Sequence, residues 1–338
     1  MMKAVGTFRS LPINDLEALL ERELPEPQAG EMDLLVRVEA ISVNPADYRV
    51  RQRKADDGVF TVLGWDVAGE VVGIGSAVTG FSIGDAVFYA GDLTRPGGNS
   101  EFHAVDARIV GHRPRSVSAA AAAALPLTAL TAWEALFERL GLSIEVDSTD
   151  RTLLIVGGAG GVGSIAIQLA RLVPGLTVVA TASRPQSRAW CQRLGAHAVI
   201  DHFADMGAQI SAFGFPAPDV ILLLNDPDRH YPALAEMLAP QGVICSIVPF
   251  DQPPDMNLLM RKSAGFVWEF MFTRPMFQTP DMDAQGIILN RIASLIENGQ
   301  LVSTEAENLG PINAANLQAA HTRLEAGRTI GKLVLAGF

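Results

Sequence analysis

The chain has 338 residues, of which 49% are hydrophobic and 19% charged, a composition typical of a globular protein that buries large cores. This length exceeds one ordinary domain and predicts two domains that share a cleft. The net charge of −11 argues against nucleic acid or an anionic membrane as a main partner.

Cysteine content and apolar stretches bear on the cellular compartment. Only Cys191 and Cys245 are present, which gives no disulfide framework and indicates a reducing compartment. The N-terminal Met1-Met-Lys-Ala-Val has no apolar signal core. The most apolar stretch, from Ala119 to Trp133, contains Pro126 and is too short to cross a bilayer. We therefore expect a soluble cytoplasmic protein with no membrane partner.

The first part of the chain, up to about Ala124, is a series of short apolar or alternating segments separated by Gly and Pro. This pattern predicts a small β-rich domain that resembles a distorted barrel. A helical passage from Ser118 to Leu140, interrupted at Pro126, then leads into the second part. The clearest strands of the first part are Leu34–Ile41, Val67–Ile74 and Asp85–Ala90.

From there to about Arg274, strands and helices alternate, which predicts a doubly wound parallel sheet. The remainder, with helices at Ala284–Gly299 and Asn313–Glu325 and a strand at Lys332–Leu335, is expected to return to the first domain. The predicted fold is therefore α/β, with a Rossmann domain (124–274) inserted in a β-rich domain (1–123 and 275–338). We expect the functional site in the cleft between them. The predicted strands of the Rossmann domain are Leu153–Val156, Thr177–Ser183, Ala198–Asp201, Val220–Asn225, Gly242–Pro249 and Gly265–Phe272.

A glycine-rich turn between the first of these strands and the next helix fits G-x-G-x-x-G, the fingerprint of a dinucleotide site. Gly158, Gly160 and Gly163 are its three glycines, and Gly161 and Val162 lie inside it. The first glycine is expected to permit the tight turn, the second to let a pyrophosphate approach the backbone, and the third to let helix and strand pack closely. The phosphates would bind at the open N–H groups of the helix. A nucleoside-triphosphate loop is excluded, because Ser-Ile, rather than Lys-Ser/Thr, follows Gly163.

The end of the second strand bears on the choice of cofactor. An NAD site carries Asp or Glu there, but no acidic residue occurs between Arg151 and Ile200. The strand ends instead in Ser183-Arg184, with Arg188 one turn later. Hydroxyl and guanidinium groups suit a ribose 2′-phosphate, so NADPH is favoured over NADH. The alternative is that both arginines are solvated surface charges.

Several segments together resemble the medium-chain dehydrogenase/reductase superfamily. They look most like its quinone-oxidoreductase branch and the subgroup named zinc-type alcohol dehydrogenase-like. The resemblance implies a GroES-like catalytic domain around the inserted Rossmann domain, and a homodimer that pairs through edge strands such as Gly265–Phe272. The segments that carry it are 43–51, 64–71 with Gly84-Asp85, 124–133, the glycine turn, 225–230, 268–274 and 327–332.

The positions of the superfamily's zinc ligands do not carry zinc ligands here. Zinc members place Cys at the position of Asn44 and Gly-His-Glu at the position of Gly64-Trp65-Asp66, and an amide with an indole cannot complete a tetrahedral zinc site. The cysteine-rich lobe that holds a structural zinc is replaced by a short segment between Gly91 and Glu101. The six histidines show no metal-ligand spacing, so we expect no zinc.

Without a Lewis acid, the chain is expected to reduce electron-poor acceptors, namely quinones or the activated C=C bonds of enones and enals, by hydride transfer from NADPH. Asn44 and Tyr48 are the candidates for hydrogen-bond donation to the acceptor oxygen. Tyr48 could equally line the cleft wall, and Asn44 could fix backbone geometry or the cofactor. Asp47 is expected to bond nearby N–H groups, and Trp65 to shape the pocket with apolar bulk.

Further cofactor contacts are implied by the resemblance. Thr128 and Thr131 match a segment that runs beneath the nicotinamide, although helix capping near Pro126 explains them equally well. His202 matches an aromatic residue near the adenine, or else is a surface histidine. An apolar cluster of Met271, Phe272, Met276 and Phe277 lines an acceptor pocket or is ordinary core. The remaining implied cofactor residues are Asn225, Val248, Phe272 and Lys332.

Two other functions stay open on the sequence. One is an alcohol dehydrogenase that uses metal ligands outside the expected positions. The other, from a different class, is a non-enzymatic NADPH-binding protein that serves as a redox sensor or a structural protein.

Overall fold

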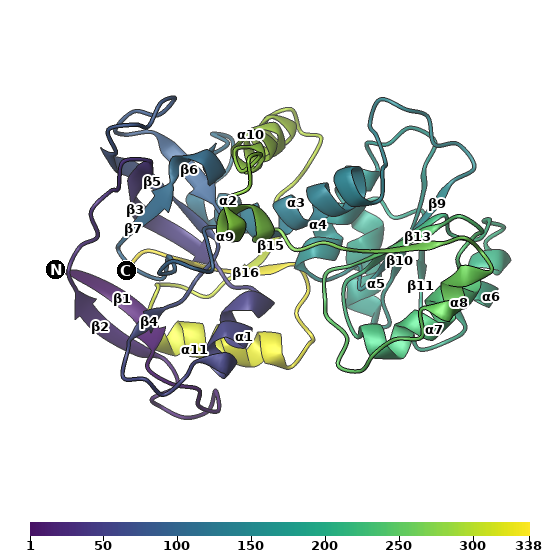
Figure 1. The fold of residues 1–338 in the computed structure, drawn as a ribbon, viewed down its shortest axis with the longest axis horizontal. Helices are drawn as coiled ribbons and strands as arrows, with labels where there is room; N and C mark the ends of the chain where they lie inside the picture. The colour runs from purple at the N-terminus through teal and green to yellow at the C-terminus, as the bar shows by residue number, and fades with distance from the viewer. The chain divides into compact units, whose positions relative to one another are not determined.

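The computed structural model describes all 338 residues and divides into two compact units. Unit 1 comprises Met1–Leu130 and Phe272–Phe338, and unit 2 comprises Thr131–Met271. The second unit is therefore an insertion in the sequence of the first, and Figure 1 draws its residues in teal to green, between the purple-to-blue and the yellow-green-to-yellow residues of unit 1 along the colour bar. The sequence had placed the borders at residues 124 and 274, so the inserted unit begins later than expected, within a helix.

Unit 1 contains two sheets. The smaller has the strand order β2-β1-β4, and the larger has the order β15-β16-β3-β5-β6-β8, with β7 paired to β3. The three predicted strands in this part are present as β3, β5 and β6. The strands are β1 (Met2–Thr7), β2 (Leu20–Leu24), β3 (Asp33–Ser42), β4 (Thr61–Val62), β5 (Val67–Ile74), β6 (Ala86–Tyr89), β7 (Phe102–Asp106), β8 (Gly111–His112), β15 (Glu305–Asn308) and β16 (Lys332–Ala336).

The last strand, β16, places the C-terminal segment beside the end of β3. The two strands are antiparallel, with Val334 opposite Ser42 and Ala336 opposite Ala40. The backbone N–H of Val43 also donates to the carbonyl of Leu333 at 3.1 Å. The residues just after β3 are thereby next to the first residues of β16, although they are far apart in sequence.

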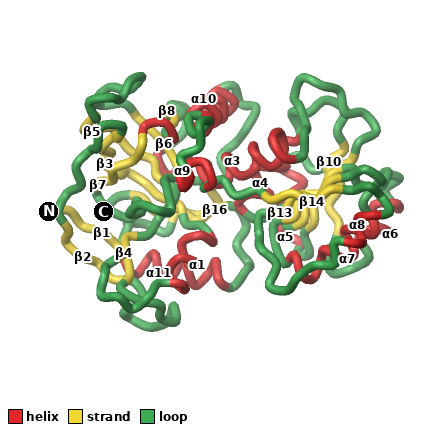
Figure 2. Tube along the Cα trace, in the orientation of Figure 1, coloured by secondary structure: helices red, strands yellow, loops and turns green.

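Unit 1 also contains helices, shown in red in Figure 2. The sequence did not predict α1, which packs against α11. The helices are α1 (Pro45–Arg53), η1 (Ala107–Ile109, a 3₁₀ turn), α2 (Ala119–Ala123), α3 (Pro126–Trp133, which crosses into unit 2), α9 (Thr273–Phe277), α10 (Ala284–Glu297) and α11 (Ala314–Glu325).

The helical passage predicted from Ser118 to Leu140 is present. It continues beyond α3 into a π-helix, η2 (Glu134–Arg139), so that Ala119–Arg139 is long and apolar enough to meet the size of a membrane span. However, 83% of its apolar window is buried inside the protein. The stretch is therefore a core helix, and with the π-helix it is longer than the apolar stretch Ala119–Trp133 that the sequence singled out.

Unit 2 is a six-stranded parallel sheet with the order β11-β10-β9-β12-β13-β14, the arrangement of a Rossmann fold. All the strands predicted for this part are present, but most end a few residues earlier than expected. The elements are β9 (Thr152–Val156), α4 (Gly161–Ala170), β10 (Thr177–Thr181), α5 (Pro185–Arg193), β11 (Ala198–Ile200), α6 (Met206–Ala212), β12 (Val220–Leu223), α7 (Pro227–Met237), β13 (Val243–Ser246), α8 (Asn257–Met260) and β14 (Gly265–Trp268).

The core of unit 2 explains why these strands read as continuous apolar runs. Every residue of β9 is buried, because successive side chains point to opposite faces and helices cover both faces. Leu154 and Val156 pack with residues of α6, α7 and α8, such as Leu234, whereas α4 packs against β9 and β10. Full burial of each such side chain contributes about 1.5–3 kcal/mol, so this sheet is a rigid platform for the turns at its carboxyl edge.

Candidate functional site

The glycine turn follows β9 as predicted, but the structural roles of its glycines differ from those expected. Gly157, which lies outside the fingerprint, has the positive φ of 92° that the tight turn requires. Gly158 instead makes room for packing, since a Cβ there would be 2.8 Å from the Cβ of Ala180 and 3.2 Å from the Sγ of Cys191. The role expected for Gly158 was therefore wrong, because the chain reverses one residue earlier.

The remaining two glycines of the fingerprint lie where the helix α4 starts. A Cβ on Gly163 would be 2.5 Å from the carbonyl oxygen of Gly157, so the close approach of helix and turn depends on this glycine. A Cβ on Gly160 would meet only that same oxygen, at 3.6 Å. Gly160 is also the N-cap of α4, and no side chain caps the helix there.

This helix N-terminus has the features of an anion site. The first N–H groups of a helix have no intrahelical partner, and the helix dipole favours negative charge beside them. Because the space at Gly160 is open, a phosphate can approach the N–H groups of the turn, which include those of Gly161 and Val162. The residues present therefore fit the pyrophosphate of a dinucleotide.

The end of β10 carries the residues expected at a 2′-phosphate. Ser183 and Arg184 are half-buried, and Arg184 is the N-cap residue of α5. The Arg188 guanidinium donates to the carbonyl oxygens of Ala182 (3.2 Å) and Val199 (2.6 Å). Arg188 is thus partly occupied in joining the ends of β10 and β11.

His202, just after β11, is connected to the glycine turn through one threonine. Its Nδ1 lies 3.2 Å from the hydroxyl of Thr181, which also accepts the backbone N–H of Gly157 at 3.0 Å. Burial lowers the pKa of His202, so its ring is neutral at pH 7. Half-buried Val248 and exposed Asn225 follow β13 and β12, so the candidate residues that follow the strands of unit 2 lie at the carboxyl edge of the sheet, whereas Thr131 lies on α3.

A pair of buried glutamates at the end of β14 was not predicted. Glu269 follows Trp268 and shares a hydrogen bond with Glu134 of the π-helix η2. Arg139, on the same helix, places its Nε 3.0 Å from Glu269 Oε2. Burial, and then the neighbouring Glu134, raise the pKa of Glu269 to about 9, so the pair holds a proton at neutral pH. No local sequence signal connects residues 134 and 269.

In unit 1, Asn44 lies at the start of a helix rather than in a loop. It is the N-cap of α1, and Pro45 takes the first helical position, where its missing N–H costs nothing. The Asp47 carboxylate accepts the backbone N–H of Asn44 at 2.6 Å, which is the structural role expected for Asp47. Burial raises the pKa of Asp47 to about 7, against the opposing effects of that N–H and of Lys332.

Asp66, directly before β5, is the centre of a buried polar network. Its Oδ2 accepts hydrogen bonds from Ser42 Oγ (2.7 Å), Asn44 Nδ2 (2.8 Å) and Lys332 Nζ (3.1 Å). Its Oδ1 accepts the backbone N–H of Leu127, in the first turn of α3, at 2.7 Å. Both carboxylate oxygens are therefore occupied, and Asp66 is 0% exposed.

The other candidates of unit 1 are distributed around this network. Tyr48 is on α1, one turn after Asn44, and is half-buried. Trp65 is buried and donates its indole N–H to the carbonyl of Asp92 at 3.1 Å. The Thr128 hydroxyl donates to the carbonyl of Leu125 at 3.1 Å, so it takes part in local hydrogen bonding within the helix.

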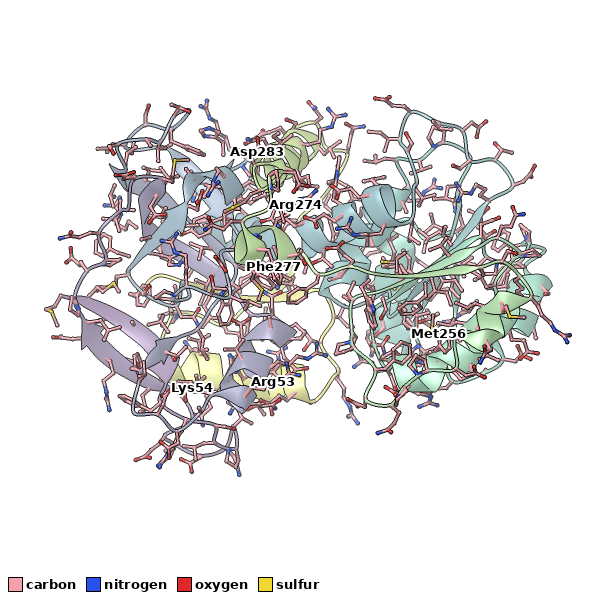
Figure 3. The ribbon with its side chains drawn as sticks, in the orientation of Figure 1. Arg53, Lys54, Met256, Arg274, Phe277 and Asp283 are labelled. Carbon is pink, nitrogen blue, oxygen red and sulfur yellow. The ribbon has the colours of Figure 1, made fainter.

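The residues near the border between the two units differ in how exposed they are. Thr131 and Met271 are buried in unit 2 and Phe272 in unit 1, whereas Phe277, labelled on α9 in Figure 3, is 73% exposed. The four-residue apolar cluster expected from the sequence is therefore not one continuous core.

Comparison with known proteins identifies the family. Residues 30–123 match the alcohol dehydrogenase GroES-like domain, and residues 194–335 match the zinc-binding dehydrogenase family. A zinc-type alcohol dehydrogenase-like protein of Staphylococcus aureus (strain MSSA476) is 39% identical over 335 residues, which cover 99% of each chain. The chain belongs to the medium-chain dehydrogenase/reductase superfamily.

Within this superfamily, the matches favour the quinone-oxidoreductase-like branch. A 2-methylene-furan-3-one reductase of Solanum lycopersicum is 30% identical over 327 residues, 94% of this chain and 74% of that protein. A protein of Rhizobium etli CFN 42, provisionally named a zinc-dependent alcohol dehydrogenase, has a crystal structure with a TM-score of 0.95, 49% identity, and coverage of 100% of this chain and 98% of that one. Quinone oxidoreductases are among the further matches by sequence and by structure.

Zinc appears in the names of such relatives, and in this chain Asn44, Trp65 and Asp66 occupy the superfamily's metal position. Asn44 offers an amide and Trp65 an indole that is already bonded to Asp92. Asp66 offers a carboxylate, but four donors hold its two oxygens, and one of them is an ammonium. These residues do not fit a tetrahedral zinc, which needs thiolate, imidazole or carboxylate lone pairs.

The segment that replaces the cysteine-rich lobe of medium-chain zinc enzymes is held by ordinary polar contacts. Arg95 forms two hydrogen bonds with the carboxylate of Asp33, both 2.8 Å. His103 donates its Nε2 proton to the carbonyl of Pro96 at 2.9 Å, and burial lowers the pKa of His103 to about 4. The segment thus has a fixed conformation that does not depend on thiolate ligands.

Proposed function

We propose that this protein is an NADPH-dependent reductase that acts without zinc and reduces quinones or the activated C=C bonds of enones and enals. The observation that carries the proposal is the occupied carboxylate of Asp66, because the position of the family's metal then offers no Lewis acid. Acceptors that are already electron-poor need no such polarisation. The reductase activity named for the tomato relative supports the same acceptor class.

The cofactor would be held at the carboxyl edge of the sheet in unit 2. The α4 N-terminus would bind the pyrophosphate, and Ser183 and Arg184 would bind the 2′-phosphate. His202, Asn225 and Val248 lie on the same edge and would line the cofactor. When bound, NADPH supplies the hydride that the acceptor carbon receives.

On the acceptor side, the chain's own groups would stabilise the negative charge that develops on the acceptor oxygen. Asn44 can donate an amide N–H but cannot lose a proton, so its role would be positional and electrostatic. The Tyr48 phenol can donate a hydrogen bond and can also release its proton, which would complete the reduction of an enone. We therefore assign charge stabilisation to both residues and proton donation to Tyr48.

The test is NADPH oxidation by chelator-treated protein, with an ortho-quinone, a medium-chain 2-enone and a simple aldehyde offered in parallel. Turnover of the quinone or the enone without aldehyde reduction is the expected result. Aldehyde reduction that appears only after zinc is restored would instead establish an alcohol dehydrogenase. NADPH binding without turnover of any acceptor would favour the sensor.

We also propose that two copies pair along β14. This strand is at the edge of the sheet, where unpaired backbone groups invite a further strand. Trp268 at its end is 50% exposed and contacts Phe266 with ring centroids 4.9 Å apart. Sedimentation equilibrium is expected to show a wild-type dimer and a Trp268→Lys monomer, and a monomeric wild type contradicts the proposal.

A cytoplasmic location is also proposed. The two cysteines are free and buried, and burial raises both thiol pKa values to about 12, which suits structural rather than reactive thiols. Fractionation of expressing cells is expected to recover the protein with cytoplasmic markers, and recovery with the membrane fraction would contradict this.

A further inference from the structure

The Lys332 side chain is buried and fully engaged within unit 1. It is 3% exposed, at the first residue of β16. Its ammonium donates to the carbonyl of Val43 at 3.0 Å, to Asp66 Oδ2 at 3.1 Å and to Asn44 Oδ1. An ammonium has three N–H donors, so these three acceptors use all of them. None is left for a cofactor phosphate or amide, the role that the family resemblance had suggested for Lys332.

These contacts fix the orientation of the Asn44 amide. The ammonium can only donate, so Asn44 must turn its carbonyl oxygen toward Lys332. The Asp66 carboxylate can only accept, so Asn44 must turn its NH₂ group toward Asp66. The flipped amide would place donor against donor and acceptor against acceptor, and both favourable contacts would be lost.

We propose that Lys332 is a positioning residue whose ammonium takes the place of the metal cation around which zinc members of this superfamily organise the same segments. It neutralises Asp66, and it holds Asn44 with one amide N–H bonded to Asp66 and the other available as a donor. The proposal that the Lys332 ammonium replaces the metal cation does not depend on the activity of the protein. Its consequence for the acceptor rests on the proposed reductase function.

The same network explains how the cation reaches several parts of unit 1 at once. Through Val43 and Asn44 it fixes the start of α1, and through Asp66 it reaches the start of β5 and the first turn of α3. A bound metal joins distant segments in the same way. Here a side chain performs this function, and its positive charge remains part of the polypeptide.

The first experiment uses Lys332→Ala and measures the thermal unfolding midpoint. The variant removes the propyl-ammonium part of the side chain and leaves an oxygen-lined pocket with an unneutralised Asp66. We expect a lower midpoint that propylammonium chloride raises toward the wild-type value, whereas 1-propanol and sodium chloride at equal concentration do not. Equal effects of propylammonium and 1-propanol would overturn the proposal, since they would show that the pocket needs volume and not charge.

A second pair of variants keeps the proposal testable if Lys332→Ala does not fold. Lys332→Met preserves the volume but leaves Asp66 unpaired, and the double variant Asp66→Asn/Lys332→Met removes both charges. We expect the double variant to unfold at a higher temperature than Lys332→Met alone, because only the single variant buries an uncompensated charge. A double variant that unfolds at the lower temperature overturns the proposal.

Binding and kinetics then separate positioning from cofactor contact. Lys332→Met is expected to leave the NADPH dissociation constant within about twofold of wild type and to lower kcat with the acceptor by tenfold or more. A large loss of NADPH affinity with unchanged kcat would overturn the assignment and restore a cofactor role. If the wild type reduces no acceptor, the reductase proposal fails, while the unfolding measurements still decide the cation replacement.

Discussion

Two glycines of the same turn should respond in opposite ways to an added methyl group. In Gly163→Ala, the new Cβ would be 2.5 Å from the Gly157 oxygen and 2.7 Å from both the carbonyl carbon and the Cα of Gly158. These are backbone atoms, which no side-chain rotation can move away. In Gly160→Ala, the Cβ would meet only the Gly157 oxygen, at 3.6 Å, and the backbone angles (φ −73°, ψ 178°) suit alanine.

The expected magnitudes follow from these distances. Gly163→Ala should lower the free energy of unfolding by about 1–3 kcal/mol, the usual cost of overpacking. Gly160→Ala should change it by no more than about 1 kcal/mol, since the lost N-cap preference and the reduced freedom of the unfolded chain oppose each other. The Gly160 methyl would, however, occupy space that a phosphate needs, so NADPH should bind at least tenfold more weakly, or about 1.4 kcal/mol.

Denaturant unfolding and calorimetric titration with NADPH measure both quantities on the same preparations. Gly160→Ala also serves as the folded control for Gly163→Ala. Wild-type NADPH affinity in Gly160→Ala would refute the assignment of the turn as the phosphate site. Unchanged stability in Gly163→Ala would refute the packing argument.

Three further predictions concern charge. Arg184→Glu should weaken the binding of NADPH by about 1.5–3 kcal/mol more than the binding of NADH, because a charge-assisted hydrogen bond to the 2′-phosphate is lost. Equal losses of affinity for both cofactors would contradict this. The pKa of Glu269 is raised from 4.5 to about 9, so the folded state retains a proton and stability falls as pH rises through that range. Glu269→Gln should therefore gain stability over wild type between pH 5 and 9 in urea unfolding, and a constant difference would count against the buried acid. Burial lowers the pKa of His321 from 6.5 to about 3, so its stability contribution is present above pH 6.5 and is lost as pH falls. The free energy of unfolding of the wild type should fall by about 2 kcal/mol between pH 6.5 and 5 because of this histidine, and that of His321→Leu should lack this decrease. Urea unfolding at a series of acidic pH values measures both.

The sequence was most informative where function depends on local pattern. Buried parallel strands read as apolar runs, and the strand–turn–helix order located the turn at 157–163 correctly. The acid-free end of β10 pointed to Ser183 and Arg184, and both lie on the carboxyl edge of the sheet. Within the turn, however, the spacing could not show that the chain reverses at Gly157, because Gly157 and Gly158 are adjacent and only the backbone angles distinguish them.

Other features were missed because their causes are not local. The helix α1 carries little apolar periodicity, and its signal was the short start Asn44-Pro45 with Asp47 three residues after the cap. Lys332 and Asp66 are separated by 266 positions, so no spacing rule connects them. The Glu134–Glu269 pair likewise depends on how η2 and β14 pack in unit 2.

The late position of Lys332 has a consequence for synthesis on the ribosome. Unit 2 is one continuous segment, Thr131–Met271, and can fold as soon as that segment has emerged. Unit 1 includes residues that are translated before unit 2, but it lacks β16, and therefore the ammonium that neutralises Asp66, until residues 332–336 are translated. The domain that starts first is thus completed last. A nascent chain that stalls before Lys332 would carry a folded unit 2 and an incomplete unit 1, in which Asp66 is not neutralised and residues 40–42 of β3 lack their partner strand.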